Sequence, residues 1–495
     1  MDTHTERAAT GIAGLDEVLG GGFPVGKVYL IEGDPGAGKS TLGLQFLRDG
    51  VARGERCVYA VLAESIKELR GLARSHGWSI DGIDLIESSG QSDSDYTLYH
   101  PSEVELSETS KSILNQIGDR KPQRVVIDSL SEVRLLAQDP LRYRRQILAL
   151  KRYFDEQGAT VLLLDFLTGT DDRQLESLCH GIIHLGQLTP EYGGQRRRLR
   201  IKKMRESDFR DGYHDFVITQ DGLDVFPRMV AAAHHRRDTY TPETCSSGLP
   251  ELDSLLGGGL DRGTSTLLLG PAGSGKSTIA AQYAKAAVER GEKAAFFIFD
   301  EVPATLIVRG EGLGMGIREH IAKGRIVLRQ VDPAQLSPGE FAQAVRRAVE
   351  VDGCTVIVID SVNGYTSAMP EEHFLSAHLH ELLAFLNQKS VVTIMVMTQQ
   401  GLIGNMQQPI DLSYLADTII LLRYFEARSQ IRQAISVVKR RTGRHERTIR
   451  ELTMDGDGVH IGDPLNEFQG VISGNLIFVG ASSALRISDG DPAQE

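Results

Sequence analysis

The stretch Gly33-Asp-Pro-Gly-Ala-Gly-Lys39-Ser40-Thr41 returns 237 residues later as Gly270-Pro-Ala-Gly-Ser-Gly-Lys276-Ser277-Thr278. Both copies match G-x-x-x-x-G-K-[ST], the pattern of a loop that binds nucleotide phosphates when it follows a strand and opens a helix. The glycines let backbone amides surround the phosphate, the lysine contacts the terminal phosphates, and the serine coordinates magnesium. We therefore predict that two sets of residues contact ATP: Gly36, Ala37, Gly38, Lys39, Ser40 and Thr41, and Gly273, Ser274, Gly275, Lys276, Ser277 and Thr278.

The repeat extends well beyond these loops. Gly11 to Gly22, which contains Leu15-Asp16, returns as Gly248 to Gly259 with the same shift of 237 residues, and later landmarks keep nearly the same spacing. Self-similarity at a fixed period marks a duplicated structural unit. For this chain of 495 residues we expect a first domain over 1–230, a polar linker over 231–247, a second domain over 248–474 and a mobile tail over 475–495.

Short β-branched runs alternate with segments of helical period in each copy. The first copy has such runs at Val28–Ile31, Cys57–Leu62, Val125–Ile127, Val161–Leu164 and Gly181–Leu185, and a helical segment at Ser40–Arg53. Continuous apolar strands that alternate with helices are typical of a parallel sheet covered on both faces. The predicted fold class is therefore α/β, with two tandem domains, each a mainly parallel sheet flanked by helices.

The composition of the chain limits the kinds of function that it can have. Apolar residues make up 41% of the chain, and 54 basic against 66 acidic side chains give a net charge of −12. That balance disfavours non-specific attraction to nucleic acid or to an anionic membrane. Four widely spaced cysteines without a C-x-x-C pair indicate neither a zinc site nor a disulfide framework. With no signal peptide and no apolar run of about 18 residues, we expect a cytoplasmic protein.

Acidic residues complete the predicted sites. Asp128 and Asp360 each end an apolar run, which is where a second magnesium ligand is expected, although a capping aspartate is the alternative. Glu64 and Glu301 each follow the loop lysine by 25 residues at the end of a short strand. A carboxylate there is a candidate general base, and a solvated acid at the strand end is the alternative.

Each copy closes with a Lys-x-Arg on a predicted strand. These are Lys203-Met204-Arg205, preceded by an arginine-rich run, and Lys439-Arg440-Arg441. Solvated hairpin cations, a nucleic-acid patch and arginine fingers for a neighbouring nucleotide site are all compatible with the pattern. Their position after the nucleotide core in both copies favours the fingers.

From about Thr10 to Gly474 the chain resembles double-domain members of the KaiC family of RecA-like ATPases. The resemblance is carried by Leu-Gly-Gly-Gly before each loop, by Ala73-Arg74-Ser75-His76-Gly77-Trp78, by Leu415-Ala416-Asp417-Thr418, by Phe468-Gln-Gly-Val-Ile-Ser473-Gly474 and by the Lys-x-Arg pairs. It implies a two-tiered homohexamer with ATP and Mg²⁺ at subunit interfaces. It also implies a slow ATPase in the first tier and serine/threonine autophosphorylation in the second. A KaiB-like or response-regulator partner follows from the same resemblance.

The resemblance also assigns individual residues. The family's paired acids fall on Ala63-Glu64 and Asp300-Glu301, so Asp300 takes the role of kinase base and magnesium contact, while Ala63 leaves Glu64 alone in the first copy. The phosphorylation pair falls on Ser413-Tyr414. Further nucleotide contacts are assigned to Ser75, Lys203, Met204, Arg205, Ser207, Lys439, Arg440, Arg441 and His445. Leu313 replaces a family tryptophan near the second adenine.

Two other functions are compatible with a RecA-like core. One is a RecA- or RadA-like DNA-dependent ATPase, which the net charge of −12 and the absence of a helix-hairpin-helix or zinc segment disfavour. The other is an ATP-gated scaffold with little catalysis, which the alanine at position 63 favours.

Overall fold

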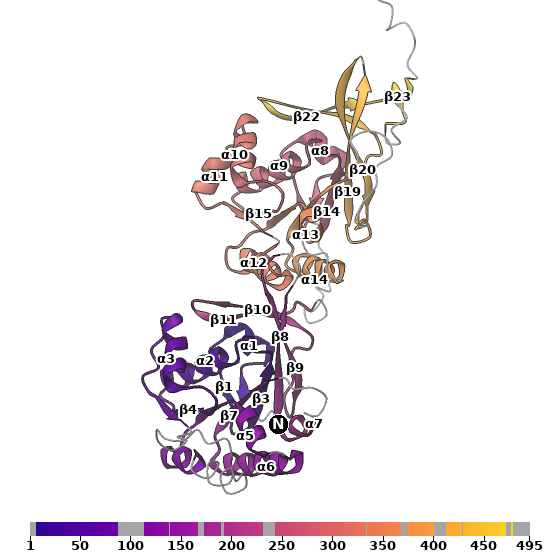
Figure 1. Ribbon diagram of the computed structural model, residues 1–495. Coiled ribbons are helices and arrows are strands. Elements are labelled where there is room, and N and C mark those ends of the chain that lie inside the picture. The colour runs from indigo at the N-terminus through magenta and orange to yellow at the C-terminus, as the bar shows by residue number, and fades with distance from the viewer. Residues whose placement is uncertain are drawn as a thin grey trace, which may run out of the picture. The chain divides into compact units, whose positions relative to one another are not determined.

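The computed structural model describes residues 6–87, 113–137, 139–166, 173–189, 193–230, 243–332, 334–367, 374–399, 412–427, 429–471 and 477–478 (Figure 1). The chain forms two compact units: Met1–Arg228 together with the short segment Ser337–Gln343, and Met229–Leu336 together with Ala344–Glu495. Most of the predicted linker, 231–242, lies outside the described residues, as does the predicted tail apart from Ile477 and Phe478.

The first unit is built on a nine-stranded sheet in the order β11-β10-β9-β8-β3-β7-β6-β4-β5. The strands from β8 to β5 in this order are parallel, and β9, β10 and β11 continue the sheet as antiparallel neighbours. The sheet strands are β3 (Val28–Gly33), β4 (Cys57–Val61), β5 (Ile83–Glu87), β6 (Arg124–Asp128), β7 (Thr160–Phe166), β8 (Gly181–Leu188), β9 (Arg196–Met204), β10 (His214–Thr219) and β11 (Gly222–Phe226). The other elements are β1 (Arg7–Ala8), α1 (Ala13–Val18), β2 (Phe23–Pro24), α2 (Lys39–Ala52), α3 (Ile66–Ser75), α5 (Leu130–Ala137), α6 (Pro140–Gln157) and α7 (Arg173–Leu178).

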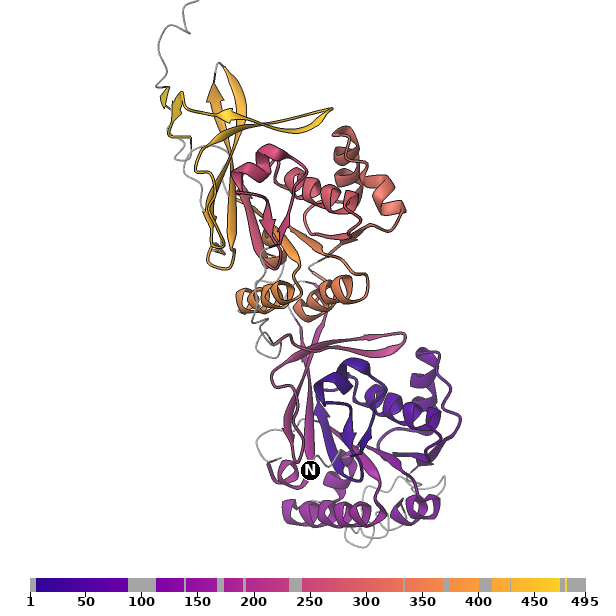
Figure 2. The ribbon, with the colours of Figure 1, turned by 180° about the vertical axis from the view of Figure 1, so that it is seen from behind.

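The second unit repeats this sheet as β16-β15-β17-β18-β14-β19-β20-β21-β22. Its strands are β14 (Ser265–Gly270), β15 (Ala294–Ile298), β16 (Ile326–Gln330), β17 (Val356–Asp360), β18 (Val392–Thr398), β19 (Thr418–Ala427), β20 (Gln430–Arg440), β21 (Arg450–Asp455) and β22 (Gly458–Pro464). The long antiparallel strands at its edge are the golden and yellow ribbons of Figure 2. The remaining elements are β12 (Thr244–Cys245), α8 (Pro250–Leu255), β13 (Leu260–Asp261), α9 (Lys276–Glu289), α10 (Pro303–Gly312), α11 (Ile317–Ala322), α12 (Pro338–Glu350), α13 (Val362–Ser367), α14 (Leu375–Gln388), β23 (Phe468–Gln469) and β24 (Ile477–Phe478).

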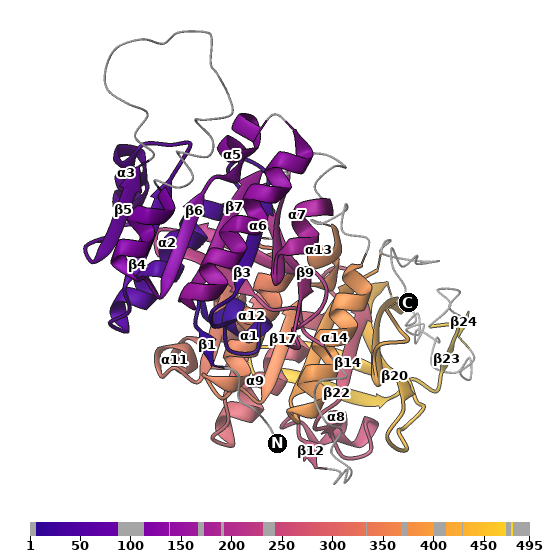
Figure 3. The same ribbon diagram turned by 90° about the horizontal axis from the view of Figure 1, so that it is seen from below.

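Each sheet has apolar cores on both faces because its central strands are buried throughout. In β3, Tyr29 and Ile31 pack on the side of α2, whereas Val28 and Leu30 pack on the side of α5 and α6. The ribbons of α2, α5 and α6 are labelled beside this sheet in Figure 3. Side chains alternate across a strand, so a strand buried on both sides has to be apolar at every position. The predicted α/β class, with two tandem helix-flanked and mainly parallel sheets, is confirmed.

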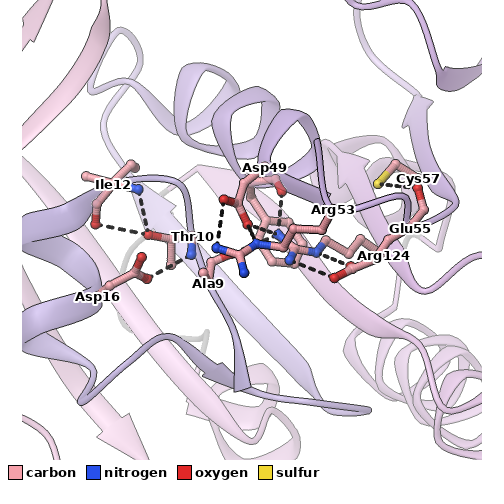
Figure 4. Close-up of polar contacts among 10 residues, drawn as sticks. Ala9, Thr10, Ile12, Asp16, Asp49, Arg53, Glu55, Cys57 and Arg124 are labelled. Atoms are coloured by element: carbon pink, nitrogen blue, oxygen red, sulfur yellow. Dashed lines mark hydrogen bonds and ion pairs between the residues drawn. The ribbon is translucent and has the colours of Figure 1, made fainter. Parts of the chain in front are cut away.

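A buried arginine fastens the segment before α1 to the body of the first unit. The Arg124 side chain is 1% exposed and extends from the start of β6 (Figure 4). Its ion-pair and hydrogen-bond partners are Asp49, Glu55 and the carbonyl oxygens of Ala9 and Phe46. The second unit has Val356 at this register position, and there Arg290 donates a hydrogen bond of 2.8 Å to the Ser246 carbonyl oxygen instead. The two copies therefore hold the same opening motif with different cations.

Candidate nucleotide sites

The two glycine-rich loops join a central parallel strand to a helix. Gly38 and Gly275 precede α2 and α9 with φ angles of 99° and 98°, a left-handed conformation that favours glycine. The Lys39 ammonium donates to the carbonyl oxygens of Gly33 and Asp34 at 2.8 and 2.9 Å. Lys276 likewise donates to the two carbonyls at the start of its own loop, at 3.0 and 2.6 Å. Both ammonium groups are therefore held inside the loop, where a phosphate would lie.

The other predicted loop residues take equivalent places in the two units. Ala37 and Ser274 are fully buried, and the Ser274 hydroxyl donates to the carbonyl oxygen of Pro271 at 2.8 Å. Gly36 and Gly273 also have positive φ angles, and Thr41 and Thr278 are buried in the first turn of the helices. Because the loop adjoins strands that run in parallel, it lies at their carboxyl ends, where such sheets bind ligands.

A serine and an aspartate meet beside each loop. The Ser40 hydroxyl donates to Asp128 Oδ2 at 2.7 Å, and the Asp360 carboxylate accepts a hydrogen bond from Ser277. The pKa of Asp360 is raised because burial disfavours its charged form. Its Oδ2 is buried and has no hydrogen-bond partner in the described part of the chain. Hard oxygen donors of this kind suit Mg²⁺, so both pairs fit the predicted metal position.

The first candidate base, Glu64, lies in a turn. The strand β4 ends at Val61, three residues before Glu64, and not in the predicted Ala63-Glu64-Ser65. The reason is local: Ser65 caps α3 and exchanges hydrogen bonds with Glu68. This capping box starts the helix at Ile66. Partial burial and the charges of Asp128 and Glu68 raise the pKa of Glu64. An acid with a raised pKa beside the loop lysine suits a general base.

The second pair of acids is bound by side chains of its own unit. Glu301 accepts two hydrogen bonds from the Arg309 guanidinium, at 3.0 and 2.7 Å. Asp300 is exposed and accepts a hydrogen bond from the Ser361 hydroxyl. Leu72 occupies the position in α3 that corresponds to Arg309 in α10. The two glutamates thus lie in different electrostatic surroundings.

A cavity of about 610 Å³ adjoins the second loop. It is lined by Gly273, Gly275, Lys276, Ser277, Thr278, Arg309, Gly312, Leu313, Gln433, Met454 and Asp455. Leu313 lies in this lining together with the loop residues. The volume suits a ligand of nucleotide size.

The two loop lysines differ in their electrostatic surroundings. Burial lowers the pKa of both, and for Lys276 the value falls to about 8, with only Asp360 favouring the charged form. Lys39 is supported by the carboxylates of Asp128, Asp165, Asp34 and Glu64. Asp165 is the last residue but one of β7, and its register counterpart in β18 is Met397. The second site therefore holds its lysine with less compensating charge.

The Lys-x-Arg residues lie at the ends of β9 and β20 and bond to their own chain. Lys203 donates to the carbonyl oxygens of Glu176 and Cys179 at 2.8 and 2.9 Å, and Arg205 donates to that of Ser177 at 3.1 Å. Lys439 donates to the carbonyls of Ser413 and Ala416 at 2.7 and 2.8 Å, and Arg441 to that of Tyr414 at 2.7 Å. In each unit these cations hold the backbone just before a central strand, which is the end of α7 in the first unit and a turn in the second. Glu176 is therefore the counterpart of Ser413.

The other residues predicted to contact the nucleotide bond or pack against parts of the chain other than the glycine-rich loops. Arg440 is buried in an ion pair with Asp261 at 2.9 Å. The Ser207 hydroxyl accepts a hydrogen bond of 2.9 Å from Arg7, and that of Ser75 donates to the Leu72 carbonyl oxygen at 2.7 Å. Met204 packs against the core on the α2 side, and His445 is half-buried between β20 and β21.

Four residues near the sites do not stand out in the sequence taken copy by copy. They are Tyr59, whose hydroxyl donates to Asp128 Oδ2 at 2.6 Å, together with Asp165, Arg309 and Asp261. None belongs to a motif. Aligning the two copies with each other would have exposed all four, because each differs in chemical type from its counterpart.

Two phosphate-binding loops on duplicated, mainly parallel sheets define a tandem RecA-like P-loop protein. The family model of the KaiC ATPase domain matches residues 8–230 and again 245–466, so the chain belongs to the KaiC family of ATPases.

The four cysteines are free and buried. No helix in the described ranges is long and apolar enough to cross a membrane.

Curated relatives cover nearly the whole chain. Circadian clock protein KaiC3 of Synechocystis sp. is 25% identical over 499 residues, which span 98% of this chain and 97% of that protein. Circadian clock oscillator protein KaiC of Parasynechococcus marenigrum is 25% identical over 483 residues, covering 95% of this chain and 93% of that protein. The corresponding protein of Acaryochloris marina is also 25% identical, over 477 residues, with 94% and 90% covered.

Proposed function

We propose that this protein is an ATP hydrolase and serine/threonine autokinase that acts as a cytoplasmic homohexameric signalling or timing protein. ATP and Mg²⁺ would bind at both loops, with Ser40, Asp128, Ser277, Asp300 and Asp360 around the metal. Glu64 would serve as base in the first site, and Asp300 with Glu301 in the second. Each site would lie at a subunit interface, and a KaiB-like or response-regulator protein would be the downstream partner.

One observation carries the autokinase part of this proposal. Lys439 and Arg441, which the family resemblance places near ATP, hold the backbone of the turn that contains Ser413 and Tyr414. A nucleotide that engages these cations would therefore act on the same turn that offers the acceptor hydroxyls. Tyr414 is 57% exposed, so its phenol is accessible in this chain.

The comparison between copies supports placing the kinase in the second unit. The counterpart of Ser413 is Glu176, whose carboxylate has no hydroxyl to phosphorylate and pairs with Lys202 at 3.0 Å. The first unit thus carries a carboxylic side chain where the second carries a serine. We propose that phosphorylation of Ser413 places negative charge in the second unit at the position where the first unit has Glu176.

The test is phosphosite mapping by mass spectrometry after incubation with ATP and Mg²⁺. We expect phosphate on Ser413, Tyr414 or both in the wild type, and none in Lys276→Ala. The matched control is Lys39→Ala, which disables the first loop and should leave phosphate on the turn. A wild-type protein that hydrolyses ATP yet carries no phosphate would contradict the autokinase and leave the ATPase standing.

A further inference from the structure

The first site contains a buried tyrosine that bonds to its metal-side aspartate. Tyr59 lies in β4 with a fully buried side chain, and its hydroxyl donates to Asp128 Oδ2 at 2.6 Å. Burial keeps the pKa of Tyr59 well above its ordinary value, so the hydroxyl retains its proton and acts as a donor. The same carboxylate oxygen accepts the Ser40 hydroxyl at 2.7 Å. Asp128 Oδ2 is therefore fixed by two donors.

The second site lacks the tyrosine at a matched position. Tyr59 pairs with Val126 and Val61 with Asp128 between β4 and β6, while Phe296 pairs with Val358 between β15 and β17. Ile298 then pairs with Asp360. Phe296 therefore has the same position relative to Asp360 that Tyr59 has relative to Asp128. A phenyl ring has no hydrogen-bond donor, and Asp360 Oδ2 is left buried without a hydrogen-bond partner in the part of the chain that is described. The chain thus holds two versions of one site that differ by this hydroxyl.

We propose that Tyr59 is a positioning residue for the magnesium–nucleotide complex of the first site, and that its absence makes the second site the weaker metal binder. A hydrogen bond to a carboxylate is stronger than one between neutral groups, and it fixes the rotation of the acid. With Oδ2 held, Oδ1 is the oxygen available to the metal or to its water. Partners of this outer kind affect metal affinity although they never touch the ion. The inference rests on nucleotide binding by the first loop, and it does not depend on phosphorylation of Ser413.

The experiment isolates each site and exchanges the two residues. Lys276→Ala leaves the first loop intact, and Tyr59→Phe is added to it; Lys39→Ala leaves the second loop intact, and Phe296→Tyr is added to that. The probe is Mn²⁺, whose binding is followed by electron paramagnetic resonance with a non-hydrolysable ATP analogue present. Binding of a fluorescent ATP analogue in EDTA and thermal melting serve as controls for metal-independent binding and for folding.

We expect Tyr59→Phe to weaken Mn²⁺ binding at the first site by about tenfold, the lower end of what loss of an outer partner costs. Phe296→Tyr should strengthen it at the second site, because the new hydroxyl meets an unpartnered oxygen. Binding in EDTA should not change. Equal Mn²⁺ affinities in the presence and absence of the tyrosine hydroxyl would overturn the proposal. A loss of affinity for the ATP analogue in Tyr59→Phe that is the same in Mn²⁺ and in EDTA would also overturn it. Absence of phosphate on the turn alongside the expected shift would count against the autokinase alone.

Discussion

The guanidinium of Arg309, which lines the cavity beside the second loop, binds both carboxylate oxygens of Glu301, at 3.0 and 2.7 Å. A bidentate arginine stabilises the charged carboxylate and occupies the lone pairs that a base would use to accept a proton. Both residues also act on Asp360, whose charge is disfavoured by Glu301 and favoured by Arg309. The pair therefore bears on the availability of the Glu301 oxygens and on the predicted metal position together.

Replacing Arg309 by leucine, the residue that corresponds to it in the first unit, should release Glu301. In a Lys39→Ala background, we expect Arg309→Leu to raise the turnover number of the second site on the order of tenfold, a modest part of what a general base supplies. Steady-state hydrolysis measured against ATP concentration separates turnover from KM. The reciprocal Leu72→Arg, in a Lys276→Ala background, should slow the first site.

A fall in turnover in Arg309→Leu, with nucleotide affinity intact, would contradict this interpretation. It would show that the arginine aids the reaction directly. The two variants are matched, since each turns one unit's residue into the other's at the same place in the helix that follows the acids.

The sequence identifies the loops, the strands and the duplicated architecture because each depends on local pattern. Lys39 and Asp128 are both found by motif, and the structure brings the Ser40 hydroxyl to within 2.7 Å of Asp128. Arg309 and Tyr59 are not found, since their roles depend on which residue stands across a helix turn or a strand pair. The strand β4 also ends earlier than the sequence predicts, because Ser65 caps a helix that starts at Ile66.

Arg440 offers a test of a sequence-based assignment. Its guanidinium and the Asp261 carboxylate are each 5% exposed and lie 2.9 Å apart. Removal of one partner leaves a buried charge uncompensated, so Arg440→Ala should destabilise the second unit by about 3–5 kcal/mol. Replacing both, as Asp261→Leu with Arg440→Met, should restore most of that loss because no charge is then left buried.

Denaturant unfolding of the single and double variants measures this coupling, and ATP binding is measured on the same samples. The structural role requires that the double variant bind ATP at the second site. If Arg440→Ala instead unfolds like the wild type and loses ATP, Arg440 serves the nucleotide as the sequence predicts.

His214 should make the first unit sensitive to acid. Its Nε2 bonds to the Arg210 carbonyl oxygen at 3.0 Å, and its Nδ1 accepts the Arg228 amide hydrogen at 2.9 Å, an arrangement that requires neutral imidazole. Burial lowers its pKa to about 4, below the ordinary 6.5. The folded unit is therefore favoured fully above pH 6.5, and up to about 3 kcal/mol is lost as the pH falls toward 4. Unfolding by urea across this range should show the loss, and His214→Gln should flatten it.

Lys276 should make nucleotide binding at the second site depend on alkaline pH. Its pKa is about 8 because the ammonium is buried with only Asp360 to offset the cost. Bound phosphates favour the charged form, so binding takes up a proton above pH 8 and affinity should fall there by up to about tenfold per pH unit. Below that pH the lysine is already charged and contributes no slope. Four carboxylates favour the charged form of Lys39, so the first site should keep its affinity for the nucleotide to higher pH. Calorimetric titration of Lys39→Ala and Lys276→Ala with an ATP analogue compares the two sites. Lys276→Arg, in the Lys39→Ala background, stays charged and should bind with a flat profile; parallel profiles for the two lysine sites would refute the link to Lys276.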